Sequence, residues 1–120
     1  MFFIFKLMGL KYSSCFSGII SSFAGPFFRS SKICHSNISK AFPDLNKKER
    51  NKILKKMWFN YGRILAEYMF IKDFRTNEDF SKKIVVENQD ILEKIRKDSK
   101  PVIFVSGHFN NFELMAMHIE

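Results

Sequence analysis

The sequence has few of the residues that build disulfide frameworks or metal sites. Its 120 residues include two cysteines and three histidines, and Cys15 and Cys34 match neither a disulfide scaffold nor the paired spacing of a zinc site. We therefore predict two reduced thiols, no metal site and no resident cofactor. Proline and glycine number only three and five, and no repeat or low-complexity tract occurs, which excludes collagen-like and disordered classes of protein.

Acidic residues are scarce in the first half of the chain. Residues 1–28 carry two lysines and no acidic residue, residues 29–60 carry nine basic and two acidic residues, and residues 61–120 carry nine basic and ten acidic residues. The formal net charge of +8 therefore comes from the first 60 residues. A basic block that follows an apolar N-terminus favours an anionic membrane surface as the partner. The alternative is that the lysines form solvated helix faces.

Charge is absent from residues 12–28, a run of 17 residues. As a helix this run would extend ~26 Å, close to the ~30 Å hydrocarbon core of a bilayer. Three interpretations are open: a short or tilted membrane-spanning helix, a helix in the headgroup plane, and a cleavable signal with the small residues Ser22 and Ala24 near its end. More basic residues follow the run than precede it, so the positive-inside rule keeps the rest of the chain cytoplasmic. We prefer an uncleaved membrane anchor at residues 1–28.

Residues 29–46 have the turn signals of a basic linker, most clearly around Pro43 and Asp44. Asn46 is followed three positions later by Glu49, the spacing of a capping box, so a helix should begin near Lys47. From there apolar residues recur every three or four positions, which predicts an amphipathic helix with a basic opposite face. The apolar positions are Ile53, Leu54, Met57, Trp58, Tyr61, Ile64, Leu65, Tyr68 and Met69.

The rest of the chain has the pattern of an α/β fold. After a polar break at residues 73–79, the β-branched residues 84–86 predict a strand, and Asn88 can cap a helix over residues 89–97. The apolar run at residues 102–105 predicts a second strand, buried on both faces. Strand, helix and strand predict a parallel βαβ unit, followed by a helix from Asn110 or Asn111 through Ile119. Because two parallel strands cannot form a stable sheet alone, we interpret residues 47–120 as the N-terminal part of an incomplete α/β domain.

Candidate catalytic residues lie where the second predicted strand meets the last helix. His108 follows Gly107, which permits a sharp turn, and Glu113 comes five positions after the histidine. A histidine at the carboxyl end of a parallel strand can act as a general base, and a carboxylate can hold its tautomer. Residues five apart on an ideal helix are about 140° out of phase, so the two can meet only if His108 lies on the turn before the helix. The alternative is structural, since Asn110 and Glu113 also have capping-box spacing.

Three ordered stretches resemble one known family. Residues 102–114, VIFVSGHFNNFEL, are similar to the histidine motif of the lipid A biosynthesis acyltransferases, the lauroyl and myristoyl transferases, which is close to HFGNWEL. Residues 37–45, NISKAFPDL, with Glu49 and Arg50 after them, resemble the family's NxxxAFPxLxxxER region, and residues 61–67, YGRILAE, resemble its next helix. The resemblance covers nearly the whole chain. Two positions depart from the motif, with Asn110 in place of glycine and Phe112 in place of tryptophan.

The resemblance implies an enzyme attached to the bacterial inner membrane, with its catalytic part on the cytoplasmic side. Its reaction would be the transfer of a fatty acyl group from acyl carrier protein to a hydroxyl of a lipid A precursor, with no cofactor beyond this acyl donor. His108 would be the base that removes the hydroxyl proton, and Glu113 would be its orienting partner. Asn111 and Gly107 would support the turn or bind substrate.

Other functions remain open from the sequence. The acceptor could be another glycolipid or glycerolipid, because the chemistry of base and hydroxyl would be the same. A non-catalytic, basic membrane-binding module, or an inactive fragment of an enzyme, would have the same N-terminal residues. Nucleic acid is not expected as a partner, because the aromatic side chains recur at the spacing of a helix core and are not interleaved with the lysines.

Overall fold

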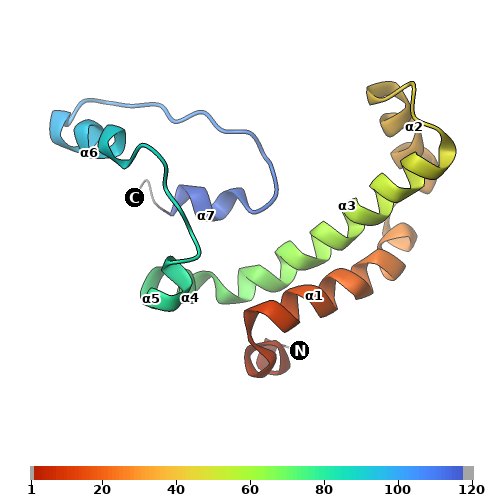
Figure 1. Ribbon diagram of the computed structural model, residues 1–120, viewed down its shortest axis with the longest axis horizontal. Coiled ribbons are helices and arrows are strands. Elements are labelled where there is room, and N and C mark those ends of the chain that lie inside the picture. The colour runs from red at the N-terminus through yellow and green to blue at the C-terminus, as the bar shows by residue number, and fades with distance from the viewer. Residues whose placement is uncertain (1, 118–120) are drawn as a thin grey trace. The chain divides into compact units, whose positions relative to one another are not determined.

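Helices follow one another through residues 2–117, the part of the chain that the computed structural model describes. They account for 75% of these residues, and no strand occurs among them. The chain forms two units, residues 1–70 and residues 71–120. The elements are α1 (Phe2–Phe28), α2 (Ser31–Ala41), α3 (Lys47–Glu67), the 3-10 turn η1 (Tyr68–Phe70), α4 (Ile71–Thr76), α5 (Glu78–Ser81), α6 (Gln89–Asp98) and α7 (Phe112–Ala116) (Figure 1).

The predicted α/β class, with its parallel βαβ unit, is wrong for this structure. Residues 84–86 and 101–109 have no regular secondary structure. The side chains of Val85 and Val105 are 82% and 93% exposed, so neither segment is a buried strand. A strand satisfies its backbone N–H and C=O groups only beside another strand, and a parallel sheet also needs cover on both faces. Short β-branched runs supply the propensity for a strand, but they do not supply these partners.

Helix α1 is the predicted apolar helix, and it contains a kink. Gly9 has a φ of 74°, in the left-handed region that glycine adopts without steric cost. The turns before Gly9 fold back on the helix, where Ser13 Oγ donates a hydrogen bond of 2.6 Å to the carbonyl oxygen of Phe5. The ring of Phe5 meets that of Phe16 edge to face, with 6.5 Å between centroids. The straight part of α1 therefore begins at about residue 10.

Helices α1 and α3 pack side by side in antiparallel directions (Figure 1). Small residues allow the close approach. A Cβ on Gly18 would lie 2.9 Å from Cε2 of Phe59, and one on Gly62 would overlap the backbone oxygen of Ser17. Packing of this density leaves no room for even one methyl group at Gly62.

Polar side chains also join α1 and α3, where the beginning of the straight part of α1 meets the last turns of α3. Ser14, which is 5% exposed, donates from Oγ to Oε1 of Glu67 at 2.8 Å. Nε of Arg63 donates to the same Ser14 hydroxyl at 3.0 Å, and the Arg63 guanidinium lies 3.5 Å from Glu67 Oε1. Ser14 is buried, whereas the Arg63 side chain is 47% exposed, so the cluster ties the buried hydroxyl of α1 to charged groups at the edge of the helix contact.

The stretch interpreted as a linker, residues 29–46, is largely helical. Helix α2 occupies most of it, and only the stretch around Pro43 and Asp44 forms the turn that the sequence predicts. The capping box at the start of α3 is confirmed. Asn46 Oδ1 accepts from the N–H groups of Lys48 and Glu49 at 2.9 and 3.1 Å, and the Glu49 carboxylate accepts from the N–H of Asn46 at 2.8 Å. Cys34, in α2, and Cys15, in α1, are both free thiols.

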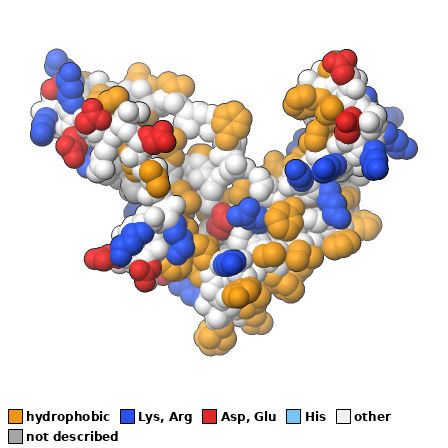
Figure 2. Space-filling model, viewed as in Figure 1, with side chains coloured by type: hydrophobic (Ala, Val, Ile, Leu, Met, Phe, Trp, Pro, Cys, Tyr) orange, Lys and Arg blue, Asp and Glu red, His pale blue; other side chains and the backbone are white. Residues whose placement is uncertain are grey.

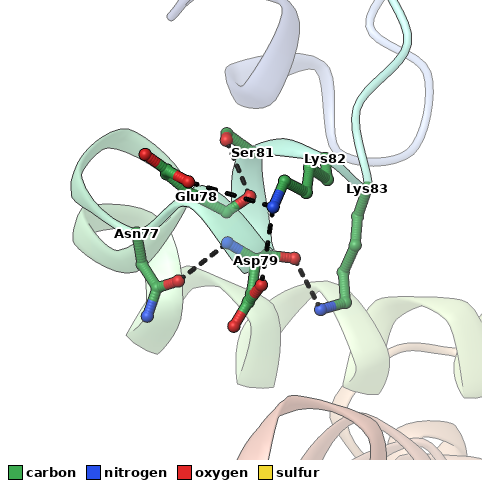
Figure 3. A network of polar contacts seen from close by, with 6 residues as sticks. All are labelled: Asn77, Glu78, Asp79, Ser81, Lys82 and Lys83. Carbon is green, nitrogen blue, oxygen red and sulfur yellow. Dashed lines mark hydrogen bonds and ion pairs between the residues drawn. The ribbon is translucent and has the colours of Figure 1, made fainter.

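The second unit begins with two short helices in place of the expected polar break. Figure 3 shows the contacts that hold α5: Asn77 Oδ1 accepts from the N–H of Asp79 at 2.9 Å, and Lys83 Nζ donates to the carbonyl oxygen of Asp79 at 3.0 Å. The ammonium group of Lys83 also lies 4.7 Å from the centre of the Phe80 ring. These exposed contacts end α5 and direct the chain into residues 84–88.

Helix α6 begins at Gln89, as the sequence predicts, but for a different reason. Asn88 has a φ of 56° and makes no capping hydrogen bond with its side chain. Its role is conformational, because asparagine tolerates the left-handed region better than most residues. The apolar side chains of α6 are only partly covered, and Ile91 is 54% exposed.

Candidate active site

The segment that carries the candidate catalytic residues lies open to solvent. Residues 101–110 are all exposed and have no helix or strand. Ile103 is 89% exposed and Phe109 is 81% exposed. The apolar run before His108 is therefore an extended surface segment, and the expected burial on both faces is not found.

Gly107 and His108 form a tight turn ahead of α7. The N–H of Phe109 donates to the carbonyl oxygen of Gly107 at 2.9 Å, so His108 is the central residue of a three-residue turn. The ring of Phe109 folds back over Gly107, and a Cβ on Gly107 would overlap it. A larger residue at this position would need the exposed ring of Phe109 to move aside.

His108 lies on the turn before the helix, and Glu113 lies in the first turn of α7. The imidazole packs on the ring of Phe112, with 3.9 Å between ring centroids and 42° between the planes. Among residues 2–117, no hydrogen bond or ion pair joins His108 to Glu113. The structure thus brings the two residues to the same short segment without placing them in contact.

The asparagines beside the histidine shape the start of α7. Asn111 is the residue that precedes the helix, and its side chain makes no capping hydrogen bond. Glu113 is then the second residue of α7, whereas a capping box needs the acidic residue at the third position. The capping-box alternative for Asn110 and Glu113 therefore does not describe this helix. The sequence predicts this helix from Asn110 or Asn111 through Ile119. Among the described residues α7 covers only Phe112–Ala116, and residues 118 and 119 lie outside them.

An open cavity of about 690 Å³ lies in the same unit. Its volume is within the range of ~300–1,000 Å³ that small-molecule sites occupy. Leu114 and Met115 reach it from α7, next to Glu113, and Ser106 Oγ contacts Met115 Sδ at 3.7 Å. The sequence does not predict this cavity, because two of the segments that line it have the pattern of strands. The lining residues are Lys83, Ile84, Val85, Val86, Glu87, Asn88, Ile91, Leu92, Phe104, Leu114 and Met115.

The described part of the chain brings no three His, Cys, Asp or Glu side chains together as metal ligands. The donor atoms near α7 are an imidazole, a carboxylate and amide groups. Such groups can transfer protons and donate hydrogen bonds, and both acyl transfer and hydrolysis need these two functions.

Comparison with known families decides between these chemistries. The sequence model of the bacterial lipid A biosynthesis acyltransferases matches residues 1–120. The chain belongs to this family. Searches of curated proteins and of solved structures gave no match. Membership makes the protein an acyltransferase of lipid A biosynthesis with a lipid substrate.

The two departures of this lipid A acyltransferase from the histidine motif have structural counterparts. Asn110 has a φ of 43°, in the left-handed region that glycine adopts freely and that asparagine tolerates. The asparagine can therefore hold the backbone shape of the glycine it replaces. Phe112 contacts the imidazole of His108 directly, so an aromatic ring at this position, as in the motif, packs against the histidine.

Proposed function

We propose that the protein transfers a fatty acyl group from acyl carrier protein to a hydroxyl of a lipid A precursor at the cytoplasmic face of the bacterial inner membrane. The observation that carries the proposal is the family match along residues 1–120, which includes the His108 segment. An apolar N-terminal helix, long enough by length and composition to cross a membrane, supports attachment to the bilayer.

In the proposed reaction His108 is the general base. Its imidazole takes the proton of the acceptor hydroxyl while the oxygen attacks the carbonyl carbon of the acyl thioester. The carbon–sulfur bond then breaks, the new ester forms, and the proton passes to the departing thiolate of the carrier. The exposed position of His108 on a turn supports this role, because both substrates are large and must reach the imidazole together.

Glu113 would orient the imidazole and stabilise its protonated form, as the carboxylate does in a serine hydrolase. It is half-buried in the first turn of α7, one residue after the ring that packs on His108. Catalytic hydrogen bonds are often absent from a substrate-free structure and form in the substrate complex. The proposal therefore requires the Glu113 side chain to turn toward His108 when substrate binds.

Gly107 and Asn111 would have supporting roles. Gly107 lets the Phe109 ring fold over the turn that carries His108. Asn111 follows His108 by three residues and comes two residues before Glu113 in the sequence. In the proposed reaction its side-chain amide donates a hydrogen bond to the oxyanion that forms during attack. The apolar cavity beside α7 has room for part of the fatty acyl chain.

Replacing the base tests the proposal. His108→Ala in the full-length protein should lower acyl transfer from acyl carrier protein by about 10²–10⁴-fold, the usual contribution of a general base. The matched control is His35→Ala, because His35 lies in α2, in the other unit. Glu113→Gln should also lose activity, with Glu93→Gln on α6 as its control. Full activity of His108→Ala would contradict the proposal.

The acceptor is tested separately by mass spectrometry of lipids from a deletion strain. Loss of one acyl chain from lipid A, restored by the intact gene and not by the His108→Ala gene, is the expected result. Loss of an acyl chain from another glycolipid or a glycerolipid instead would keep the chemistry and change the acceptor.

A further inference from the structure

The side of α1 that faces away from α3 is an apolar stripe. We call it the outer face, and its residues recur every three or four positions, opposite Gly18 and Gly25. Phe23 is 69% exposed and Phe27 is 90% exposed. In Figure 2 hydrophobic side chains gather along the edge of the molecule that α1 forms. The outer face consists of Tyr12, Phe16, Ile19, Ile20, Phe23 and Phe27.

The side of α1 that faces α3 contacts charged side chains of that helix. Ser14, near the start of the straight part of α1, is hydrogen bonded to Glu67 and Arg63 of α3. Farther along α1, the ammonium group of Lys55 lies against the ring of Phe23. If α1 crossed the bilayer with its contact to α3 intact, these charged side chains of α3 would enter the hydrocarbon with it, where they are strongly disfavoured.

Lysines extend from the side of α3 that faces α1. At 100° per residue, Lys48, Lys52, Lys55 and Lys56 fall within an arc of about 100° that also contains Phe59, which contacts α1. The ammonium group of Lys55 lies 5.9 Å from the centre of the Phe23 ring. The four lysines are exposed, and Lys55 thus connects the basic side of α3 to the outer face of α1.

We propose that α1 and α3 dock together in the plane of an anionic phospholipid bilayer. The outer face of α1 enters the boundary between headgroups and acyl chains, and Lys48, Lys52, Lys55 and Lys56 contact the headgroups. An amphipathic surface with an aromatic stripe beside lysines is typical of such docking. An acidic protein partner would account for the lysines, but it would leave the apolar stripe beside them in water. The proposal concerns attachment only and does not depend on the acyl acceptor or on His108.

Depth measurements separate docking in the plane from crossing the bilayer. Nitroxide labels are attached at Phe16→Cys, Ile20→Cys, Phe23→Cys and Phe27→Cys, each with Cys15→Ser and Cys34→Ala, on vesicles of phosphatidylglycerol and phosphatidylcholine. All four labels should lie at one similar depth, about 5–10 Å below the headgroups. Asp44→Cys, in the exposed turn between α2 and α3, should report water. A depth that changes steadily along α1, with one end at each surface, would overturn the proposal.

Charge removal tests the role of the lysines. Lys52→Gln with Lys55→Gln should lower partitioning onto phosphatidylglycerol vesicles by about 25-fold, at about 1 kcal/mol per lysine. Partitioning onto phosphatidylcholine vesicles should hardly change. The control, Lys40→Gln with Lys47→Gln, removes the same charge, and Lys47 lies about 140° from Lys52 around α3. Unchanged partitioning of the Lys52 and Lys55 variant, or equal losses in the two variants, would overturn the proposal, as would a loss confined to binding of acyl carrier protein.

Discussion

In residues 1–70, side chains from helices far apart in the sequence interlock, whereas in residues 71–120 the segment that carries His108 lies open. Ala66 and Ser13 are 0% exposed in the first unit, and residues 101–110 of the second are all exposed. The first unit is built to hold its shape by packing. The second presents the His108 segment to solvent, where the proposed reaction needs it. Under the proposed function, stability and chemistry are therefore carried by different parts of the chain.

The largest effect on stability is expected from filling the contact between α1 and α3. Gly62→Ala should lower the free energy of unfolding by about 1–3 kcal/mol, because its methyl group overlaps the backbone of Ser17. Urea unfolding followed by circular dichroism measures the loss, with Asn51→Ala on the exposed side of α3 as the control. Equal stability of the Gly62 variant and the control would show that the helices do not pack as described.

A smaller loss is expected at the start of α3. Asn46→Ala removes the side chain that accepts from Lys48 and Glu49 and should cost about 1 kcal/mol. The comparison is Asn88→Gly at the start of α6, where no capping bond is lost and the positive φ favours glycine. Stability of the Asn88 variant should be retained or slightly raised. Equal losses at both positions would contradict the different roles of the two asparagines.

Substitutions at Asn110, in the second unit, should act through backbone conformation: glycine should be favoured here and a β-branched residue disfavoured. Asn110→Gly should be neutral or stabilising by about 0.5 kcal/mol and should keep acyl transfer, because glycine relieves the φ of 43°. Asn110→Val should lower activity, because a β-branched residue resists this conformation. If the valine and glycine variants had equal activity, the positive φ at Asn110 would not matter for acyl transfer.

The smallest effect is expected in the apolar run before His108. Val105→Ser should change the free energy of unfolding by less than about 0.5 kcal/mol, since the side chain is 93% exposed. A buried strand residue would instead lose about 2 kcal/mol or more. Urea unfolding of this variant beside Phe70→Ser, whose side chain is 3% exposed, gives the contrast. A loss of about 2 kcal/mol or more in the free energy of unfolding of Val105→Ser would show that Val105 is buried, as the predicted strand requires.

Local signals in the sequence predicted local structure well. Asn46 and Glu49 sit three residues apart, and they form the capping box that this spacing predicts. His108 was expected on a turn before a helix, and the structure places it there. In both cases the determining contacts lie within a few residues of one another.

Predictions that depended on distant partners failed or were missed. The segments at residues 84–86 and 102–105 have strand propensity, but pairing depends on groups elsewhere in the chain. The link from Ser14 to Arg63 and Glu67 crosses about 50 residues, and its one sequence signal is a serine inside an apolar run. The contact between His108 and Phe112 was not predicted, because the spacing of His108 and Glu113 pointed to a carboxylate as the partner of the imidazole.

In our interpretation, residues 71–120 carry the chemistry, while residues 1–70 carry stability and membrane binding. Acyl transfer and membrane binding measured on the same His108→Ala protein test this interpretation most directly. The variant should lose about 10²–10⁴-fold in transfer from acyl carrier protein while it binds phosphatidylglycerol vesicles as tightly as the unmodified protein and unfolds at the same urea concentration. Retained transfer, or loss of transfer together with vesicle binding, would contradict the account.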